Sequence, residues 1–131
     1  DERIKAGAGF VAFNQMTGLM AATRTGVVSG ADGTSYLEGH PYFNFIPELL
    51  RYCDVDDFLA TMAPRPLLSL AGERDEYFPH EVVRDIYGRQ RHIYELLGVP
   101  EHIDLLVYPG PHDMAPELRA RAWAFFEEWL K

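Results

Sequence analysis

Two side chains suited to acid–base chemistry stand in turns that follow two successive apolar runs. The first is Asp75, which comes just after the run 66–71, and the second is His112, which comes just after the run 103–108. A carboxylate that accepts a hydrogen bond from Nδ1 of an imidazole sets the tautomer of that ring and leaves Nε2 free to act as a base. The pair therefore indicates general-base chemistry, provided that the fold brings the two turns together.

Short apolar runs without polar alternation, closed by Gly or Pro, are typical of parallel strands covered on both faces. The runs 66–71 and 103–108 fit this description, and the apolar run 4–13, interrupted only by Lys5, predicts a third strand. An amphipathic stripe from residue 79 to 97, ended by Gly and Pro, predicts a helix that connects the last two strands. Because neighbouring parallel strands lie about 5 Å apart and end at the same edge of the sheet, their turns can meet.

The remaining segments predict a lid and three further helices. Residues 14–40 are rich in glycine without a sustained period and read as a long loop or lid, followed by a short helix from residue 46. A second short helix is expected over 55–62, with Asp54 as its N-cap. The final helix begins near Pro116 and presents an apolar face made by Leu118, Ala122, Phe125, Phe126 and Trp129.

Composition limits the partners that the chain can bind. Its 131 residues carry a formal net charge of −8 at pH 7, which disfavours nucleic acid and anionic membrane surfaces, since both require a basic face. The single cysteine, Cys53, leaves no intramolecular disulfide and no cysteine-based metal site. We therefore expect one partial α/β domain over residues 1–131, with three parallel strands, flanking helices and a lid region over 14–62.

The two turns and their flanks resemble a known group of enzymes. The stretches 46–79 and 94–113, with the terminal FFEEWL, are similar to the C-terminal half of an α/β-hydrolase of the dienelactone hydrolase and acetyl xylan esterase-like group. In that group a G-x-x-D-x-x-x-P turn carries the acid of the catalytic triad and a P-G-G-H turn carries its base. The resemblance maps these roles onto Asp75 and His112, with Pro111 in place of a glycine.

The nucleophile of such a triad is missing from the sequence. No G-x-S-x-G motif occurs, and the nearest match, around Ser29, places its first glycine one position too far from the serine. Ser35 lies in the predicted loop, Ser69 lies inside a predicted strand, and Cys53 has no strand-to-helix elbow. We therefore expect the nucleophile, the oxyanion hole and the first five strands to belong to another part of the parent protein.

Other ionisable side chains offer competing interpretations. Glu73 and Glu76 are alternative acids in the first turn, whereas Asp113 suits the N-cap of the final helix better than a catalytic role. Three histidines lack the H-x-x-x-H spacing of a metal site, and we expect no metal there: His80, His92 and His102.

Three further groups of residues have structural interpretations. Arg65 stands between two prolines and is expected to pair with Asp56 or Asp57, and His40 is expected in a plain loop. A group of aromatic residues is interpreted as core, with a roof over the acyl pocket as the alternative: Tyr42, Phe43, Phe45 and Tyr52.

The resulting hypothesis is the C-terminal portion of a serine-type hydrolase that acts on a carboxylic ester. The resemblance implies a small-molecule ester as substrate of the intact enzyme and no cofactor. The alternatives are a non-catalytic fragment or interaction module, or a portion of a prolyl oligopeptidase-type peptidase. In each case the first strand leaves a bare sheet edge, so the expected partner is the missing N-terminal half or a second copy of the chain.

Overall fold

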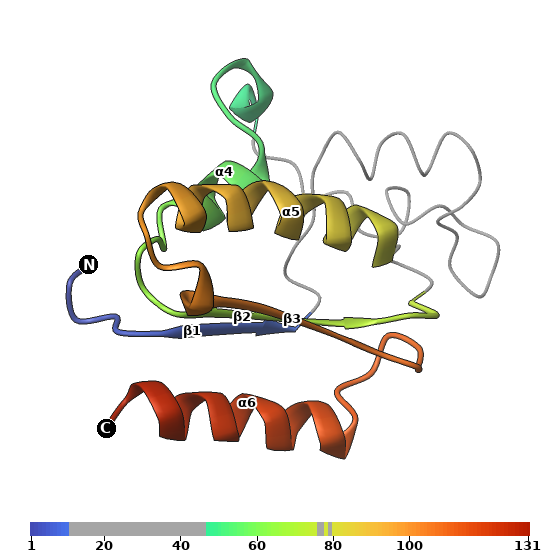
Figure 1. Cartoon of the computed structure of the whole chain (residues 1–131). Coiled ribbons are helices and arrows are strands. Elements are labelled where there is room, and N and C mark those ends of the chain that lie inside the picture. Colours follow the sequence, from blue (N-terminus) through green and yellow to red (C-terminus); the bar gives the residue numbers. More distant parts are fainter. Residues whose placement is uncertain (11–46, 76–77, 79) are drawn as a thin grey trace, which may run out of the picture.

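A parallel sheet of three strands lies between two layers of helices (Figure 1). The computed structural model describes residues 1–10, 47–75, 78 and 80–131. The strands follow the order of the sequence across the sheet and are β1 (Gly7–Phe10), β2 (Leu67–Gly72) and β3 (Ile103–Tyr108). The predicted bounds of β2 and β3 are confirmed to within one residue. β1 begins three residues later than expected, and residues 11–13 of that prediction lie outside the described residues.

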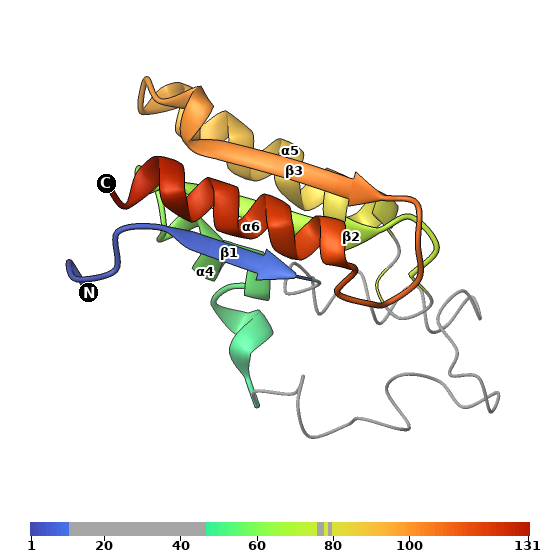
Figure 2. The same ribbon diagram turned by 90° about the horizontal axis from the view of Figure 1, so that it is seen from below.

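The helices occupy both faces of this sheet. Among the described residues they are η1 (Leu49–Arg51), α4 (Val55–Ala60), α5 (His80–Leu96), η2 (Pro100–His102) and α6 (Pro116–Trp129). α4 and α5 cover one face, and α6 covers the other (Figures 1 and 2). None of the helices in these ranges combines the length and apolar character needed to cross a bilayer. The predicted lid residues 14–46 lie outside the described part of the chain.

Two apolar cores result from the alternation of side chains along β2. Leu67 and Ala71 point toward α5, where they pack with a buried group made by Val83, Ile86, Tyr94 and Ile103. Leu68 and Leu70 point the other way and pack against α6. The residues of α6 in this second core, Leu118, Ala122, Phe125, Phe126 and Trp129, are those of the predicted apolar face. Because β2 is buried on both sides, the absence of polar alternation in its sequence is explained.

The end of α5 follows the expected glycine signal. Gly98 has a φ of +76°, a conformation in which a side chain is strained, and its N–H donates to the Glu95 carbonyl at 3.0 Å. The N–H of Val99 donates to the Tyr94 carbonyl at 3.0 Å. These two bonds are the Schellman arrangement, which satisfies the last carbonyls of a helix. The chain can then turn directly into η2 and β3.

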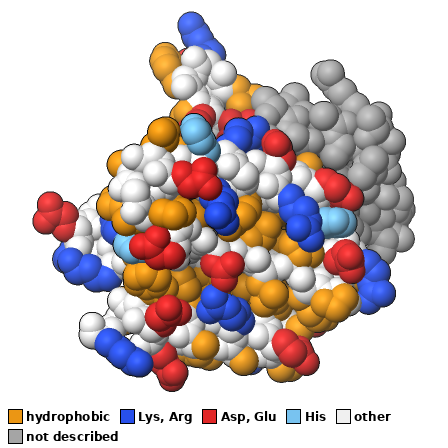
Figure 3. Space-filling view, in the orientation of Figure 1, with side chains coloured by type: hydrophobic (Ala, Val, Ile, Leu, Met, Phe, Trp, Pro, Cys, Tyr) orange, Lys and Arg blue, Asp and Glu red, His pale blue; other side chains and the backbone are white. Residues whose placement is uncertain are grey.

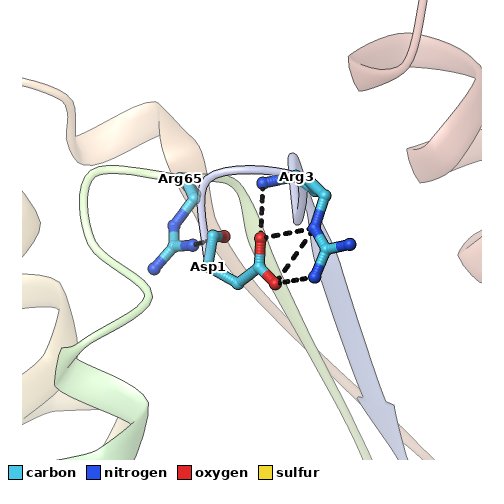
Figure 4. A network of polar contacts seen from close by, with 3 residues as sticks. All are labelled: Asp1, Arg3 and Arg65. Carbon is cyan, nitrogen blue, oxygen red and sulfur yellow. Dashed lines mark hydrogen bonds and ion pairs between the residues drawn. The ribbon is translucent and has the colours of Figure 1, made fainter.

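Arg65 ties three backbone segments together instead of forming the predicted ion pair. Its guanidinium donates to the carbonyls of Thr61 and Met62, at 2.7 and 3.1 Å, and to that of Asp1 at 3.0 Å (Figure 4). The prediction of an Asp56 or Asp57 partner is wrong, because Asp56 is 5% exposed and binds Arg89 of α5 at 2.8 Å. Arg65 therefore joins the turn that follows α4 to the N-terminal segment of the chain.

Two further predictions need correction. The N-cap position of α6 is Ala115, with no side-chain cap and Pro116 as the first helical residue, so Asp113 does not cap this helix. Proline supplies a suitable φ at that position and has no N–H to satisfy. Tyr52 is 81% exposed and does not belong to a core. The other three members of its predicted aromatic group lie outside the described residues.

Candidate functional site

The carboxyl ends of the three strands deliver three rings to one place. Phe10 is the last residue of β1, Phe78 follows β2, and His112 follows β3. Parallel pairing sets this arrangement, since Leu70 of β2 lies opposite both Phe10 and Leu106. All three strands run in the same direction in Figure 2 and end on the same side of the molecule. This is the edge at which open α/β sheets bind ligands.

Asp75 and His112 form a hydrogen-bonded pair at this edge. Nδ1 of His112 lies 2.9 Å from Oδ2 of Asp75, whose side chain is completely buried. A carboxylate can only accept, so Nδ1 donates and Nε2 keeps its lone pair. The other oxygen, Oδ1, accepts the backbone N–H of Phe78 at 2.8 Å. The imidazole is 31% exposed, which leaves it accessible from solvent while its partner is not.

Backbone hydrogen bonds join the two turns directly. The N–H of Glu73 donates to the Tyr108 carbonyl at 2.8 Å, and the N–H of Arg74 donates to the Gly110 carbonyl at 2.9 Å. The guanidinium of Arg74 adds a bond to the Pro109 carbonyl at 3.1 Å. These contacts continue the β2–β3 ladder past the ends of the strands. They hold the acid and the base in fixed relative positions.

Two glycines allow this close approach. A Cβ on Gly72 would lie 2.5 Å from the Pro111 carbonyl oxygen and 2.7 Å from that of Gly110. A Cβ on Gly110 would overlap the ring of Tyr108. Both positions therefore require glycine, because the obstacles are backbone and a packed ring. Pro111, which replaces a glycine of the resembling group, does not prevent the pair from forming.

The phenyl rings of Phe78 and Phe10 pack against His112. The Phe78 ring stacks on the imidazole with a centroid distance of 5.5 Å and an interplanar angle of 26°. The Phe10 ring is tilted by 50° at 5.9 Å. Neither phenylalanine was predicted to belong to the site. Their positions at the ends of two predicted parallel strands were the available signal.

The competing histidines His80 and His102 contact backbone carbonyls. Glu73 is exposed, and its carbonyl lies 2.9 Å from Nδ1 of His80. His102 contacts the Pro64 carbonyl at 2.6 Å and the ring of Trp129. Within the described ranges, no three His, Cys, Asp or Glu side chains are grouped to hold a metal ion. Three predicted candidates lie outside those ranges: Ser29, Ser35 and Glu76.

A groove of about 460 Å³ lies at the other end of β3, away from the pair. It is lined by charged residues of α5 and α6, and its floor includes Ile103 and Asp104, the first residues of β3. Arg121 of α6 binds Asp104 at 2.6 Å there. On the face shown in Figure 3, acidic and basic side chains are interspersed with apolar ones.

Three solved structures that superpose on this chain carry the name esterase. Over 99% of its length the chain superposes on 38% of a carbohydrate esterase family 15 glucuronoyl esterase from Caldicellulosiruptor kristjansonii, with a TM-score of 0.65 and 21% identity. It superposes on 25% of the methylesterase BT1017, with a TM-score of 0.63 and 19% identity, also over 99% of its length. The esterase Pf2001 of Pyrococcus furiosus superposes with a TM-score of 0.58 and 22% identity, over 98% of this chain and 45% of the esterase.

The chain has the fold of the C-terminal part of an α/β-hydrolase. No model of a known protein family matches the sequence. Among curated proteins, the "Putative hydrolase YtaP" of Bacillus subtilis (strain 168) is 27% identical over 97 residues, which are 74% of this chain. The chain spans about a third of the length of that relative.

Proposed function

We propose that this chain supplies the acid and the base of a serine-type hydrolase that acts on a carboxylic ester. The observation that carries the proposal is the 2.9 Å contact between His112 Nδ1 and the buried Asp75 carboxylate at the ligand-binding edge of the sheet. The esterase names of the similar structures support an ester as substrate. The nucleophile and the oxyanion hole would come from a part of the parent protein other than these residues.

The hydrogen bonds of the pair support different roles for His112 and Asp75 in the proposed reaction. Nε2 of His112 takes the proton from the serine hydroxyl as its oxygen attacks the ester carbonyl, and gives that proton to the departing alcohol. A second cycle uses water in place of serine and releases the acid. Asp75 keeps Nδ1 protonated and stabilises the imidazolium that forms in each cycle. The hydrogen bond from the Phe78 N–H to Oδ1 of Asp75 holds the carboxylate in place during both cycles.

Hydrolysis of a small aryl ester tests the proposal. It is measured for the 131-residue chain and for the longest open reading frame that contains it. We expect negligible turnover by the chain itself and robust turnover by the longer product. In the longer product, His112→Ala and Asp75→Asn each lower kcat by at least about 10³-fold, since loss of a triad member leaves only binding and electrostatic effects.

Matched substitutions separate this role from general damage. His92 is a largely exposed histidine on α5, and Asp113 is the exposed neighbour of His112, so His92→Ala and Asp113→Asn should leave kcat unchanged. Turnover that survives the loss of His112 would contradict the assignment. Activity of the short chain that Ser29→Ala abolishes would place the nucleophile within it. A preference for peptides over esters would favour the peptidase alternative.

A second candidate function is an interaction module that pairs through the outer edge of β1. Gly7 donates to the Pro66 carbonyl at 2.9 Å, so Gly7 and Gly9 face β2, and the N–H groups of Ala8 and Phe10 point away from it. Trp123 and Leu130 are 65% and 56% exposed. Arg121 of α6 binds Asp104 of β3, so it marks the side of the helix that faces β3. Trp123 and Leu130 lie about 160–180° around the helix axis from Arg121 and are therefore on the side nearer β1. These two exposed apolar side chains extend the surface formed by the outer edge of β1.

Amide hydrogen exchange within β1 tests the second candidate. In a free edge the N–H groups of Ala8 and Phe10 exchange quickly, whereas that of Gly9 is protected and serves as the internal control. We expect protection of Ala8 and Phe10 to rise with protein concentration if two copies pair, with a matching shift in size-exclusion volume. Fast exchange at every concentration would count against self-association.

A further inference from the structure

Phe78 contacts both members of the acid–base pair through different atoms. Its backbone N–H donates to Oδ1 of Asp75 at 2.8 Å, and its ring stacks on the imidazole of His112. The residue is 8% exposed, so its ring is fixed by packing. A substitution at position 78 changes the ring contact and keeps the backbone bond to Asp75. The two contributions can therefore be separated by experiment.

The hydrogen bond to Asp75 alone does not define the orientation of the imidazole. It holds the Nδ1 end of the ring, but a hydrogen bond tolerates a range of angles, so changes in the two side-chain torsions of His112 can still tilt the ring and move Nε2. The Phe78 ring, nearly parallel at an interplanar angle of 26°, contacts the imidazole face, and the tilted Phe10 ring gives a second contact. Aromatic pairs of this kind have a preferred geometry, and a phenyl face attracts a positive charge.

We propose that Phe78 is a positioning residue for His112. Its ring keeps the imidazole in the orientation that directs Nδ1 to Asp75, and it favours the imidazolium formed during proton transfer. This inference rests on the proposed function, since it assumes that His112 is the base. It assigns a task to a residue that lies three positions after Asp75 and acts through His112.

The test is nitrogen-15 and proton NMR of His112 in the 131-residue protein at neutral pH. The signal is assigned by its loss in His112→Gln. A protonated Nδ1 bound to a carboxylate gives a downfield proton, and the nitrogen shifts report the tautomer. Phe78→Leu removes the ring and keeps an apolar side chain, whereas Phe78→Tyr keeps the ring. Phe125→Leu removes a phenylalanine that is 2% exposed and packs in the α6 core.

We expect Phe78→Leu to weaken the Nδ1–H signal. The population of imidazole turned away from Asp75 should rise about 2- to 12-fold, the factor that corresponds to the energy of an aromatic pair. Phe78→Tyr should keep the wild-type signal. Phe125→Leu should lower the stability of the protein and leave the His112 signal unchanged. If Phe78→Leu does not fold, Phe78→Met replaces it, since Met also fills space without a ring.

The possible results distinguish this inference from the proposed function. A wild-type spectrum for folded Phe78→Leu or Phe78→Met would overturn the positioning role and leave the pair intact. Weakening by Phe125→Leu equal to that by Phe78→Leu would show a general packing effect and also overturn it. Absence of the Nδ1–H tautomer in the wild-type protein would overturn both, because the pair itself would not exist.

Discussion

Replacing Gly72 by alanine should separate the acid turn from the histidine turn. The new Cβ would lie 2.5 Å from the Pro111 carbonyl oxygen, 0.9 Å short of the 3.4 Å at which ordinary contact begins. The Pro111 carbonyl accepts the Asp113 N–H, and the Gly110 carbonyl, 2.7 Å from the new Cβ, accepts the Arg74 N–H, so one turn must move. A shift of this size would lengthen the 2.9 Å bond between His112 and Asp75 beyond the roughly 3.2 Å limit of normal N–H···O bonds.

The expected cost is about 1–3 kcal/mol of unfolding free energy, the usual range for overpacking a well-packed site. Urea unfolding measures this loss, and the Nδ1–H signal of His112 measures the pair. Gly88→Ala is the matched control, because a Cβ there meets nothing within 4 Å and lies in the exposed interior of α5. It should stabilise the protein by about 0.5–1 kcal/mol.

The reasoning would be refuted if Gly72→Ala kept both wild-type stability and the wild-type His112 signal. Loss of stability with an unchanged signal would show that β2 absorbs the shift and that the turns remain together. Loss of both, with a stabilised Gly88→Ala, would confirm that this glycine serves the pair.

Two further predictions concern buried and edge groups. Burial raises the pKa of Tyr94 to about 12 from an ordinary 10.0, so its neutral form stabilises the fold below pH 10. That contribution of about 2–3 kcal/mol is lost as the pH rises through about 12, and Tyr94→Phe should abolish this part of the alkaline unfolding curve. At the β3 edge, Oδ1 of Asp104 accepts the Leu105 N–H at 2.8 Å. Asp104→Ala should free that N–H and increase association by analytical ultracentrifugation, with Glu101→Ala as an exposed control.

The strands and the long helices could be predicted because their signals are local. β3 has the bounds set by its apolar run, and α5 ends where Gly98 and Pro100 require. The approach of Asp75 and His112 also followed from local features. Each lies in the turn after a parallel strand, and neighbouring parallel strands end at one edge of the sheet.

The wrong or missing predictions concern contacts with residues that are distant in the sequence. Arg65 had two carboxylates nearby in sequence, but Asp56 pairs with Arg89, which α5 brings from 33 positions away. Asp113 has the right residue type for a cap, yet Pro116 alone starts α6 three positions later. The stacking of Phe78 on His112 depends on the register of two strands and on turn geometry, neither of which the sequence states.

The acid and the base depend on one continuous stretch of chain. β2, α5 and β3 form a single strand–helix–strand unit, and the backbone bonds that join the two turns among the described residues lie within residues 73–110. Such a unit can be exchanged between related proteins by recombination at two junctions, before Leu67 and after Asp113, without rebuilding the pair. A chimeric protein that receives this one segment therefore receives the hydrogen-bonded Asp75–His112 pair whole.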